Sequence, residues 1–221
     1  MTQRCILVLG GSFDPVHKGH MALAHLFVDL LTPDELRIIP AGNPWQKQGL
    51  QASGEDRIAM AHLAFDHQFT HQGLAVTIDQ QEVRRNNASY TIDTLRSLRS
   101  ELGEQASIVF VMGADQLQQL NTWKEWLHLF DYAHLCAASR PGFSFNTMHL
   151  PNVVAEAFQC RQGTTEQIRH TPSGLSYLAS GLDVAISATE IRAALQSGKQ
   201  LDQLLPPEVL DYIYQHHLYQ S

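Results

Sequence analysis

The sequence is poor in cysteine and contains no long apolar run. Its three cysteines, Cys5, Cys136 and Cys160, form no CxxC pair. Because Cys5 and Cys136 lie inside apolar runs, we expect buried reduced thiols rather than a disulfide framework or a zinc site. No apolar stretch approaches the ~20 residues of a membrane span, and the first residues show no basic region or cleavage site of a signal peptide. The sequence therefore predicts a cytoplasmic protein without a membrane anchor.

Positive charge is also scarce. The chain has 15 Lys and Arg residues against 22 Asp and Glu residues, a formal net charge of -7. This balance argues against broad binding to nucleic acid, so a polyanionic ligand would need positive charge gathered locally. The candidate cations are Lys18, Lys47, Arg84, Arg85, Arg140 and Arg192.

Apolar runs alternate with helical patterns along all 221 residues. The periodicity predicts strands at 5–9, 36–39, 74–78, 108–112, 135–138 and 182–186. It predicts helices at 21–31, 56–65, 91–102 and 123–130, and a C-terminal helix over 206–221. This βαβ alternation indicates an α/β fold, a Rossmann-like doubly wound parallel sheet in a single domain over 1–221. Residues 143–175 are polar and irregular, and we expect an insertion there with one short helix.

A glycine-rich turn, GGSFDPVHKGH at positions 10–20, follows the first predicted strand. Gly10 and Gly11 lack the Cβ that would keep a ligand away from the backbone, and the next helix would direct free amides to the same place. His17 and His20, one helical turn apart, add donors on one face. The turn follows neither the P-loop nor the dinucleotide pattern. We predict a site for the phosphates of a nucleoside triphosphate; the alternatives are a plain tight turn and a histidine that caps the helix.

A second strand-to-helix junction lies near the C-terminus, at 186–192. Ser187 with Glu190 three residues later has the pattern of a capping box, which would explain both residues without a ligand. Hydroxyl groups and Arg192 in the first turns of a helix are also suited to holding phosphates. The residues alone leave these two interpretations equal.

The two junctions together resemble the bacterial nucleotidyltransferases of the nicotinate mononucleotide adenylyltransferase family. The resemblance continues through SYTIDTL at 89–95, GAD at 113–115, TW at 122–123, RPG at 140–142 and LPP at 205–207, and so covers nearly the whole chain. It implies a cytoplasmic enzyme of NAD biosynthesis that condenses ATP with nicotinate mononucleotide to nicotinate adenine dinucleotide and pyrophosphate. It also implies Mg²⁺ carried by ATP, with no metal ligand assigned to the protein.

The resemblance further implies roles for individual residues. His17, His20 and Arg192 would be catalytic, with His20 nearest the α-phosphate of ATP. The other residues expected to bind ATP are Gly10, Gly11, Ser12, Phe13, Gly113, Asp115, Ile186, Ser187 and Thr189. Around the mononucleotide we expect Lys47, Tyr90, Thr91 and Trp123, although the loop NPWQK at 43–47 departs from the Pro-Pro-His pattern usual in the family.

Other interpretations of single residues and of the whole chain remain open at this point. Trp123 and Trp126 have the spacing of helical core residues, and we expect Trp126 in the core. Asp14 is expected to hydrogen-bond backbone amides rather than Mg²⁺. The chain could transfer a nucleotidyl group to nicotinamide mononucleotide or phosphopantetheine instead, or be a nucleotide sensor without activity. The sequence leaves open whether copies of the chain form a homo-oligomer.

Overall fold

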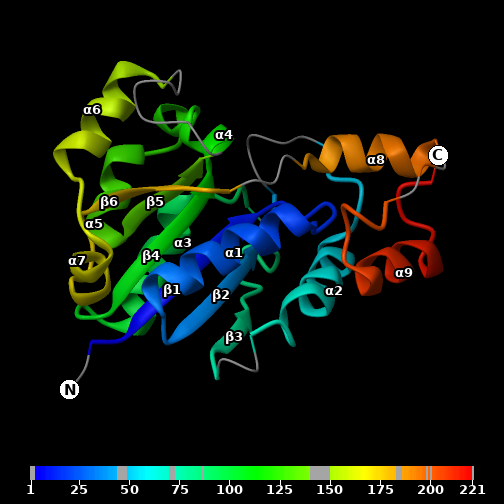
Figure 1. The fold of residues 1–221 in the computed structure, drawn as a ribbon, viewed down its shortest axis with the longest axis horizontal. Coiled ribbons are helices and arrows are strands. Elements are labelled where there is room, and N and C mark those ends of the chain that lie inside the picture. Colours follow the sequence, from blue (N-terminus) through cyan, green and yellow to red (C-terminus); the bar gives the residue numbers. More distant parts are fainter. Residues whose placement is uncertain are drawn as a thin grey trace. The chain divides into compact units, whose positions relative to one another are not determined.

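The computed structural model describes residues 3–43, 49–69, 73–85, 87–139, 150–182, 186–197, 199 and 201–220. The strands of these residues are β1 (Cys5–Gly11), β2 (Glu35–Pro40), β3 (Ala75–Ile78), β4 (Ser107–Gly113), β5 (His134–Ser139) and β6 (Ser176–Ser180). They form one sheet in the order β3-β2-β1-β4-β5-β6, which is the order of a doubly wound fold. The pairs β1 with β4, β4 with β5 and β5 with β6 are parallel (Figure 1). The predicted fold class is confirmed.

Helices connect the strands, as a parallel sheet requires. They are α1 (Lys18–Leu31), α2 (Gly54–Phe65), α3 (Thr91–Leu102), α4 (Ala114–Leu117), α5 (Leu129–Tyr132), α6 (Asn152–Cys160), α7 (Thr165–His170), α8 (Ala188–Gln196) and α9 (Pro207–Gln215), with the 3₁₀ turns η2 (Leu120–Thr122) and η3 (Trp126–His128). Four predicted helices therefore exist, including the one over 91–102. Among the described residues, no helix combines the length and the apolar character needed to cross a bilayer.

The contacts between Cα atoms divide the chain into two compact units. The first unit comprises Met1–Gly10, Leu23–Arg37 and Tyr90–Asp183, and the second comprises Gly11–Ala22, Ile38–Ser89 and Val184–Ser221. The first unit contains β4, β5 and β6 with α3 to α7, and the second contains α2, β3, α8 and α9.

The core of the first unit is built on β4 and β5. Every residue of β5 is buried, as are all of β4 except Gly113, because helices cover a parallel sheet on both faces. Cys136 in β5 and Cys5 in β1 are buried free thiols, and burial raises the pKa of both. The prediction for these two cysteines is confirmed, whereas Cys160 is an exposed free thiol.

The last strand of the sheet lies earlier in the chain than the sequence predicts. Strand β6 occupies Ser176–Ser180 rather than 182–186, of which residues 183–185 lie outside the described residues. Its ends are serines, which conceal the strand from a search for apolar runs. The buried Ser176 hydroxyl is satisfied because it donates to the Phe158 carbonyl at 2.5 Å, so the polar residue costs little there.

Three predicted helical segments also differ from the structure. No single helix spans 123–130, because Glu125 adopts a left-handed conformation (φ 52°) and the chain continues as η3 and α5. The C-terminal helix ends at Gln215, well before residue 221. The described part of the segment 143–175, residues 150–175, contains two helices, α6 and α7, where one was predicted; α7 begins with a capping box at Thr164 that satisfies its first amides.

Buried His134 gives the first unit a pH-dependent stability. Its Nε2 donates to the Thr171 carbonyl at 2.8 Å and its Nδ1 accepts from the Leu175 amide at 3.1 Å. This arrangement requires the neutral ring, and burial, together with the nearby charge of Arg99, lowers the pKa of His134 against the opposing effect of the Thr171 bond.

We expect the free energy of unfolding to fall as the pH drops below about 6.5, the pKa of an unfolded histidine. At such pH values the histidine is protonated in the unfolded chain but not in the folded chain. The free energy of unfolding therefore rises with pH, by at most about 1.4 kcal/mol per pH unit for this group. Thermal unfolding between pH 5 and pH 8 checks this. The substitution His134→Gln should flatten the dependence of stability on pH. The control is His128→Gln, which replaces the exposed partner of Asp131 and should leave that dependence as it is in the wild type. Equal slopes in all three proteins would contradict the assignment.

Candidate active site

The two histidines of the glycine-rich turn stack on each other in the second unit. Their ring centroids lie 3.6 Å apart with an interplanar angle of 21°, and the ring of buried Phe13 meets His20 edge-on at 4.9 Å. His20 Nδ1 accepts from the backbone amide of His17 at 3.2 Å. The proton of a neutral His20 ring must therefore be on Nε2, which makes that nitrogen a donor.

Gly19 lets the second junction approach this turn closely. A Cβ at Gly19 would lie 3.0 Å from His17 Nδ1 and 3.6 Å from the Cβ of Ile186. A larger residue at position 19 would therefore press on the ring of His17. One expectation is wrong in detail: the first amide of α1 is not free, because Lys18 N donates to the Leu204 carbonyl at 2.9 Å.

The junction at Ser187 begins α8 without a capping box. Ser187 occupies the N-cap position, but its side chain makes no capping hydrogen bond. The interpretation of Ser187 and Glu190 as a capping box is therefore wrong. The Ser187 and Thr189 side chains stand at the exposed start of the helix. This leaves the hydroxyl of Ser187 available to a ligand.

Arg192 joins the two junctions. Its Nη1 donates to the backbone carbonyl of Asp14 at 2.6 Å, and its Nη2 donates to the Thr189 hydroxyl at 3.3 Å. Residues more than 170 positions apart in the chain thus meet at one turn. We call His17, His20, Ser187, Thr189 and Arg192 the phosphate cluster; the role of each member is still a prediction.

Asp14 is a structural residue of the turn, as expected. Its buried carboxylate accepts from the amides of Gln51 at 2.9 Å and Ala52 at 3.0 Å, and from the Tyr219 hydroxyl at 2.8 Å. Both carboxylate oxygens are therefore engaged in fixing the loop that precedes α2 and the C-terminal segment.

Sequence reasoning missed Arg57, a buried cation of α2. Its Nη1 donates to the carbonyls of Ser12 and Ala41 at 2.9 and 2.5 Å, and burial lowers its pKa against the raising effect of nearby Asp14. Arg57 ties the glycine-rich turn to the exit of β2 and adds positive charge beside it. The available signal was an arginine in phase with the buried Met60, Ala61 and Ala64 of the same helix.

The other candidate cations are engaged elsewhere or lie outside the described residues. Lys18 Nζ donates to the Asp202 carbonyl at 2.7 Å. Arg84 and Arg85 donate to glutamines one turn earlier, Gln80 and Gln81. The predictions for Lys47 and Arg140 fall on residues outside those described.

The first unit carries the other predicted site residues, beginning at the ends of β1 and β4. A Cβ at Gly10 would lie 3.2 Å from the Phe110 ring, and one at Gly113 would lie 2.6 Å from Asp115 Oδ1. The absence of a side chain at Gly113 lets the exposed carboxylate of Asp115 fold back over the end of β4. This carboxylate accepts from Gln116 Nε2 at 3.1 Å.

Tyr90 and Thr91 stand at the start of α3, with Trp123 elsewhere in the same unit. Trp123 is half-buried and meets Phe110 edge-on at 6.1 Å, and its buried indole N–H has no hydrogen-bond partner among the residues that the structure describes. A buried donor of this kind is costly unless a ligand satisfies it. The ammonium of Lys124 lies 4.5 Å from the centroid of the Tyr90 ring and 3.5 Å from Asp93 Oδ2.

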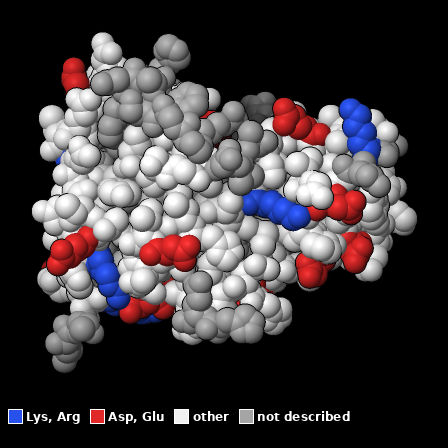
Figure 2. All heavy atoms as spheres, viewed as in Figure 1, with Lys and Arg blue, Asp and Glu red and all other residues white. Residues whose placement is uncertain are grey.

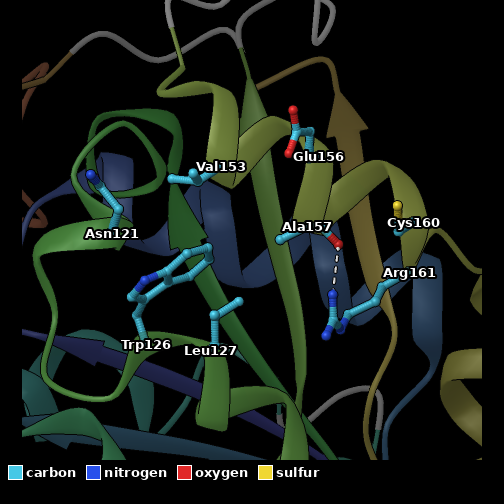
Figure 3. Close-up of a pocket in the computed structure, with 8 residues that line it drawn as sticks. All are labelled: Asn121, Trp126, Leu127, Val153, Glu156, Ala157, Cys160 and Arg161. Atoms are coloured by element: carbon cyan, nitrogen blue, oxygen red, sulfur yellow. Dashed lines mark hydrogen bonds between the residues drawn. The ribbon is translucent and has the colours of Figure 1, made fainter.

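A separate pocket of about 550 Å³ opens beside α6 (Figure 3). Its lining consists of Asn121, Trp126, Leu127, Val153, Glu156, Ala157, Cys160 and Arg161, and includes none of the predicted site residues. The figure shows the Trp126 indole facing this pocket, so the expectation that Trp126 lies in the core is wrong. The left-handed turn at Glu125 breaks the helix that would have carried the side chain inward.

Charged side chains are scattered on the face shown in Figure 2. Among the described residues of that face, both acidic and basic groups are present, and the basic groups do not gather into a broad patch. The described residues of this face therefore offer no wide positive field to an anionic ligand.

Comparison with known proteins gives one consistent family. The cytidylyltransferase-like family model matches residues 8–194. A protein of Herminiimonas arsenicoxydans is 66% identical over 99% of this chain and 98% of its own length, and one of Chromobacterium violaceum is 40% identical over 96% and 97%. Each is named "Probable nicotinate-nucleotide adenylyltransferase".

Solved structures share the fold at low sequence identity. The nicotinic acid mononucleotide adenylyltransferase of Plasmodium falciparum in complex with NaAD has a TM-score of 0.72 at 19% identity, over 98% of both chains. The same enzyme in complex with APC has a TM-score of 0.69. At this identity the likeness establishes the Rossmann-like fold.

Proposed function

Because the chain belongs to the nicotinate-nucleotide adenylyltransferases of the cytidylyltransferase-like family, we propose that it transfers the adenylyl group of ATP to nicotinate mononucleotide. The products are nicotinate adenine dinucleotide and pyrophosphate, a late step of NAD biosynthesis. The observation that carries this proposal is the meeting of Arg192 with the turn that holds His17 and His20. An enzyme that consumes ATP in this way would work in the cytoplasm.

The proposed reaction needs no general base. The second pKa of a phosphate monoester is about 6, so near neutral pH the mononucleotide phosphate is mostly a dianion. One of its oxygens forms a bond to the α-phosphorus of ATP while the bond from that phosphorus to the bridging oxygen breaks. The electron pair leaves with pyrophosphate, and no proton has to be removed from the nucleophile.

The remaining difficulty is to hold two polyanions in line and to stabilise the charge on the leaving group. Positioning supplies about 7 to 11 kcal/mol, and each preorganised donor about 2.7 to 4 kcal/mol. In the proposal His20 Nε2 donates near the α-phosphate, while His17, Ser187, Thr189 and Arg192 hold the phosphate tail. Gly11, Ser12 and Phe13 contribute backbone contacts, and Ile186 lies against adenine.

In the first unit, Gly10, Gly113 and Asp115 would contact the rest of ATP, and Tyr90, Thr91 and Trp123 the pyridine ring. Lys47 is proposed for the mononucleotide phosphate. Mg²⁺ would enter with ATP and neutralise part of the charge of its phosphates. The carboxylate of Asp14 does not fit as a ligand for this ion, because two amides and a hydroxyl already occupy its oxygens.

The test is a pyrophosphate-release assay with ATP, Mg²⁺ and one of three acceptors: nicotinate mononucleotide, nicotinamide mononucleotide or phosphopantetheine. We expect the highest kcat/KM with nicotinate mononucleotide and a dinucleotide product. Preference for another acceptor would assign the chain to that reaction. ATP binding without pyrophosphate release from any acceptor would indicate a sensor.

Trp123→Ala should raise the KM for the mononucleotide, because a ring that stacks on pyridine and an indole donor are both lost. We expect an increase of about tenfold, corresponding to ~1.4 kcal/mol, with the KM for ATP within twofold of wild type. Steady-state kinetics with each substrate varied in turn checks this. Trp126→Ala, in the pocket beside α6, is the matched control; an unchanged mononucleotide KM in Trp123→Ala would make Trp123 a packing residue.

A further inference from the structure

The hydroxyl of Tyr219 is a buried polar group that the adenylyl-transfer proposal does not use. The side chain is buried, with 6% of the residue exposed. The chain passes from the end of α9 at Gln215 through left-handed conformations at His217 (φ 52°) and Tyr219 (φ 63°). For residues other than glycine this conformation costs about 1–2 kcal/mol each. The contacts of Tyr219 must offset that cost.

The principal polar contact of Tyr219 is with the glycine-rich turn. Its hydroxyl donates to Asp14 Oδ1 at 2.8 Å, the same oxygen that accepts from the Ala52 amide at 3.0 Å, while the Gln51 amide donates to Oδ2 at 2.9 Å. Burial and the neighbouring carboxylate of Asp14 raise the pKa of Tyr219. The hydroxyl therefore keeps its proton near neutral pH and stays a donor.

Asp14 is also a hydrogen-bond partner of Arg192. Arg192 Nη1 donates to the backbone carbonyl of Asp14 at 2.6 Å, and Asp14 Oδ2 lies 3.9 Å from the same nitrogen. The second distance is too long for a hydrogen bond. A carboxylate that has lost the donor on Oδ1 is freer to turn and close this gap, because the buried carboxylate of Asp14 and the partly exposed guanidinium of Arg192 attract each other and form short charge-assisted bonds. A guanidinium paired in this way has less charge to offer a phosphate.

We propose that Tyr219 is a positioning residue for ATP: its hydroxyl keeps the Asp14 carboxylate turned to the loop amides, and so keeps Arg192 available to the phosphates. The C-terminal segment after α9 thus takes part in substrate binding without touching the substrate. This inference rests on the proposed role of Arg192 in binding ATP.

Tyr219→Phe tests the inference because it removes the hydroxyl and keeps the ring. We expect the KM for ATP to rise about tenfold, the equivalent of ~1.4 kcal/mol, and the KM for the mononucleotide to stay within twofold. The matched control is Tyr212→Phe in α9, which loses a hydrogen bond of the same kind, from Tyr212 to Asp56 Oδ1 at 3.0 Å, and should leave both constants within twofold.

A double-mutant cycle with Arg192→Ala separates positioning from general stability. If Tyr219 acts through Arg192, adding Tyr219→Phe to Arg192→Ala changes the KM for ATP less than twofold. A tenfold additive increase in that background, or equal changes in both substrates' KM values, would overturn the proposal.

Thermal unfolding with and without ATP completes the test. The shift of the midpoint by ATP is measured at each variant's own midpoint, so a less stable variant is still informative. We expect ATP to raise the thermal midpoint of Tyr219→Phe less than that of the wild type. It should raise the midpoint of Tyr212→Phe as much as that of the wild type. If Tyr219→Phe shows no unfolding transition, its hydroxyl is needed for folding and the positioning role is rejected. If the wild type binds ATP but forms no dinucleotide, the proposed function fails. The change of the thermal midpoint on adding ATP still tests the positioning role of Tyr219 in that case.

Discussion

His20→Ala is expected to reduce kcat by about 100- to 1,000-fold, the usual effect of removing one preorganised donor from a transition state. The fold should be unaffected, because the ring is partly exposed and lies at the start of α1 rather than in the core. Rapid-quench or steady-state measurement of pyrophosphate release, together with the thermal midpoint, checks both statements.

Two further variants define the chemistry of His20. His20→Gln keeps a neutral hydrogen-bond donor, so its rate should fall between those of the wild type and His20→Ala. If His20 were a general base, glutamine could not replace it, and His20→Gln would be as slow as His20→Ala. His62→Ala is the matched control, since His62 is a half-exposed histidine of α2 paired with Asp66, and it should retain full activity. A His20→Ala rate within twofold of wild type would remove His20 from the reaction.

Arg192→Ala is expected to raise the KM for ATP about 30-fold, equivalent to ~2 kcal/mol for the loss of a charged partner of a phosphate. The KM for the mononucleotide should change much less. The variant also loses the bond from Nη1 to the Asp14 carbonyl, so the thermal midpoint should fall slightly. Kinetics with either substrate varied at saturation of the other distinguishes these effects.

Arg192→Lys and Arg161→Ala complete this prediction. Lysine keeps the charge but not the two-pronged geometry that bonds both Asp14 and Thr189, so part of the loss should remain. Arg161 lines the pocket beside α6, and its removal should leave both KM values unchanged. Equal increases for the two substrates in Arg192→Ala would show that Arg192 supports the whole fold rather than ATP.

Most of the sheet could be predicted because five of its strands are rich in apolar residues, even though β2 also contains Arg37. Strands buried on both faces have this pattern: β1 keeps it through all of its buried residues, and β5 keeps it between the buried polar residues at its ends, His134 and Ser139. Strand β6 lacks it, since its serines find partners such as the Phe158 carbonyl only in the folded chain. The break at Glu125 was equally hidden, because a left-handed glutamate has no sequence signal comparable to glycine.

The candidate site was predictable where local chemistry defines it. The spacing of His17, Gly19 and His20 predicts a donor pair at a helix start, and the structure stacks the two rings there. For Ser187 the local pattern was misleading, since a capping box and a ligand site use the same residue types. The absent side-chain cap in α8 can be seen only in the structure.

Local pattern thus accounts for the α/β class, the positions of five strands and the histidine pair, because periodicity and glycine placement act over a few neighbouring residues. The bonds from Arg57 to the Ser12 carbonyl, from Arg192 to the Asp14 carbonyl and from Tyr219 to the Asp14 carboxylate span 45, 178 and 205 positions of the chain. No periodicity records such contacts, since they arise when packing brings separate segments together and buried polar groups must find partners. The sequence predicts backbone amides as partners of Asp14, but only the folded chain shows that these are the amides of Gln51 and Ala52 and that the Tyr219 hydroxyl joins them.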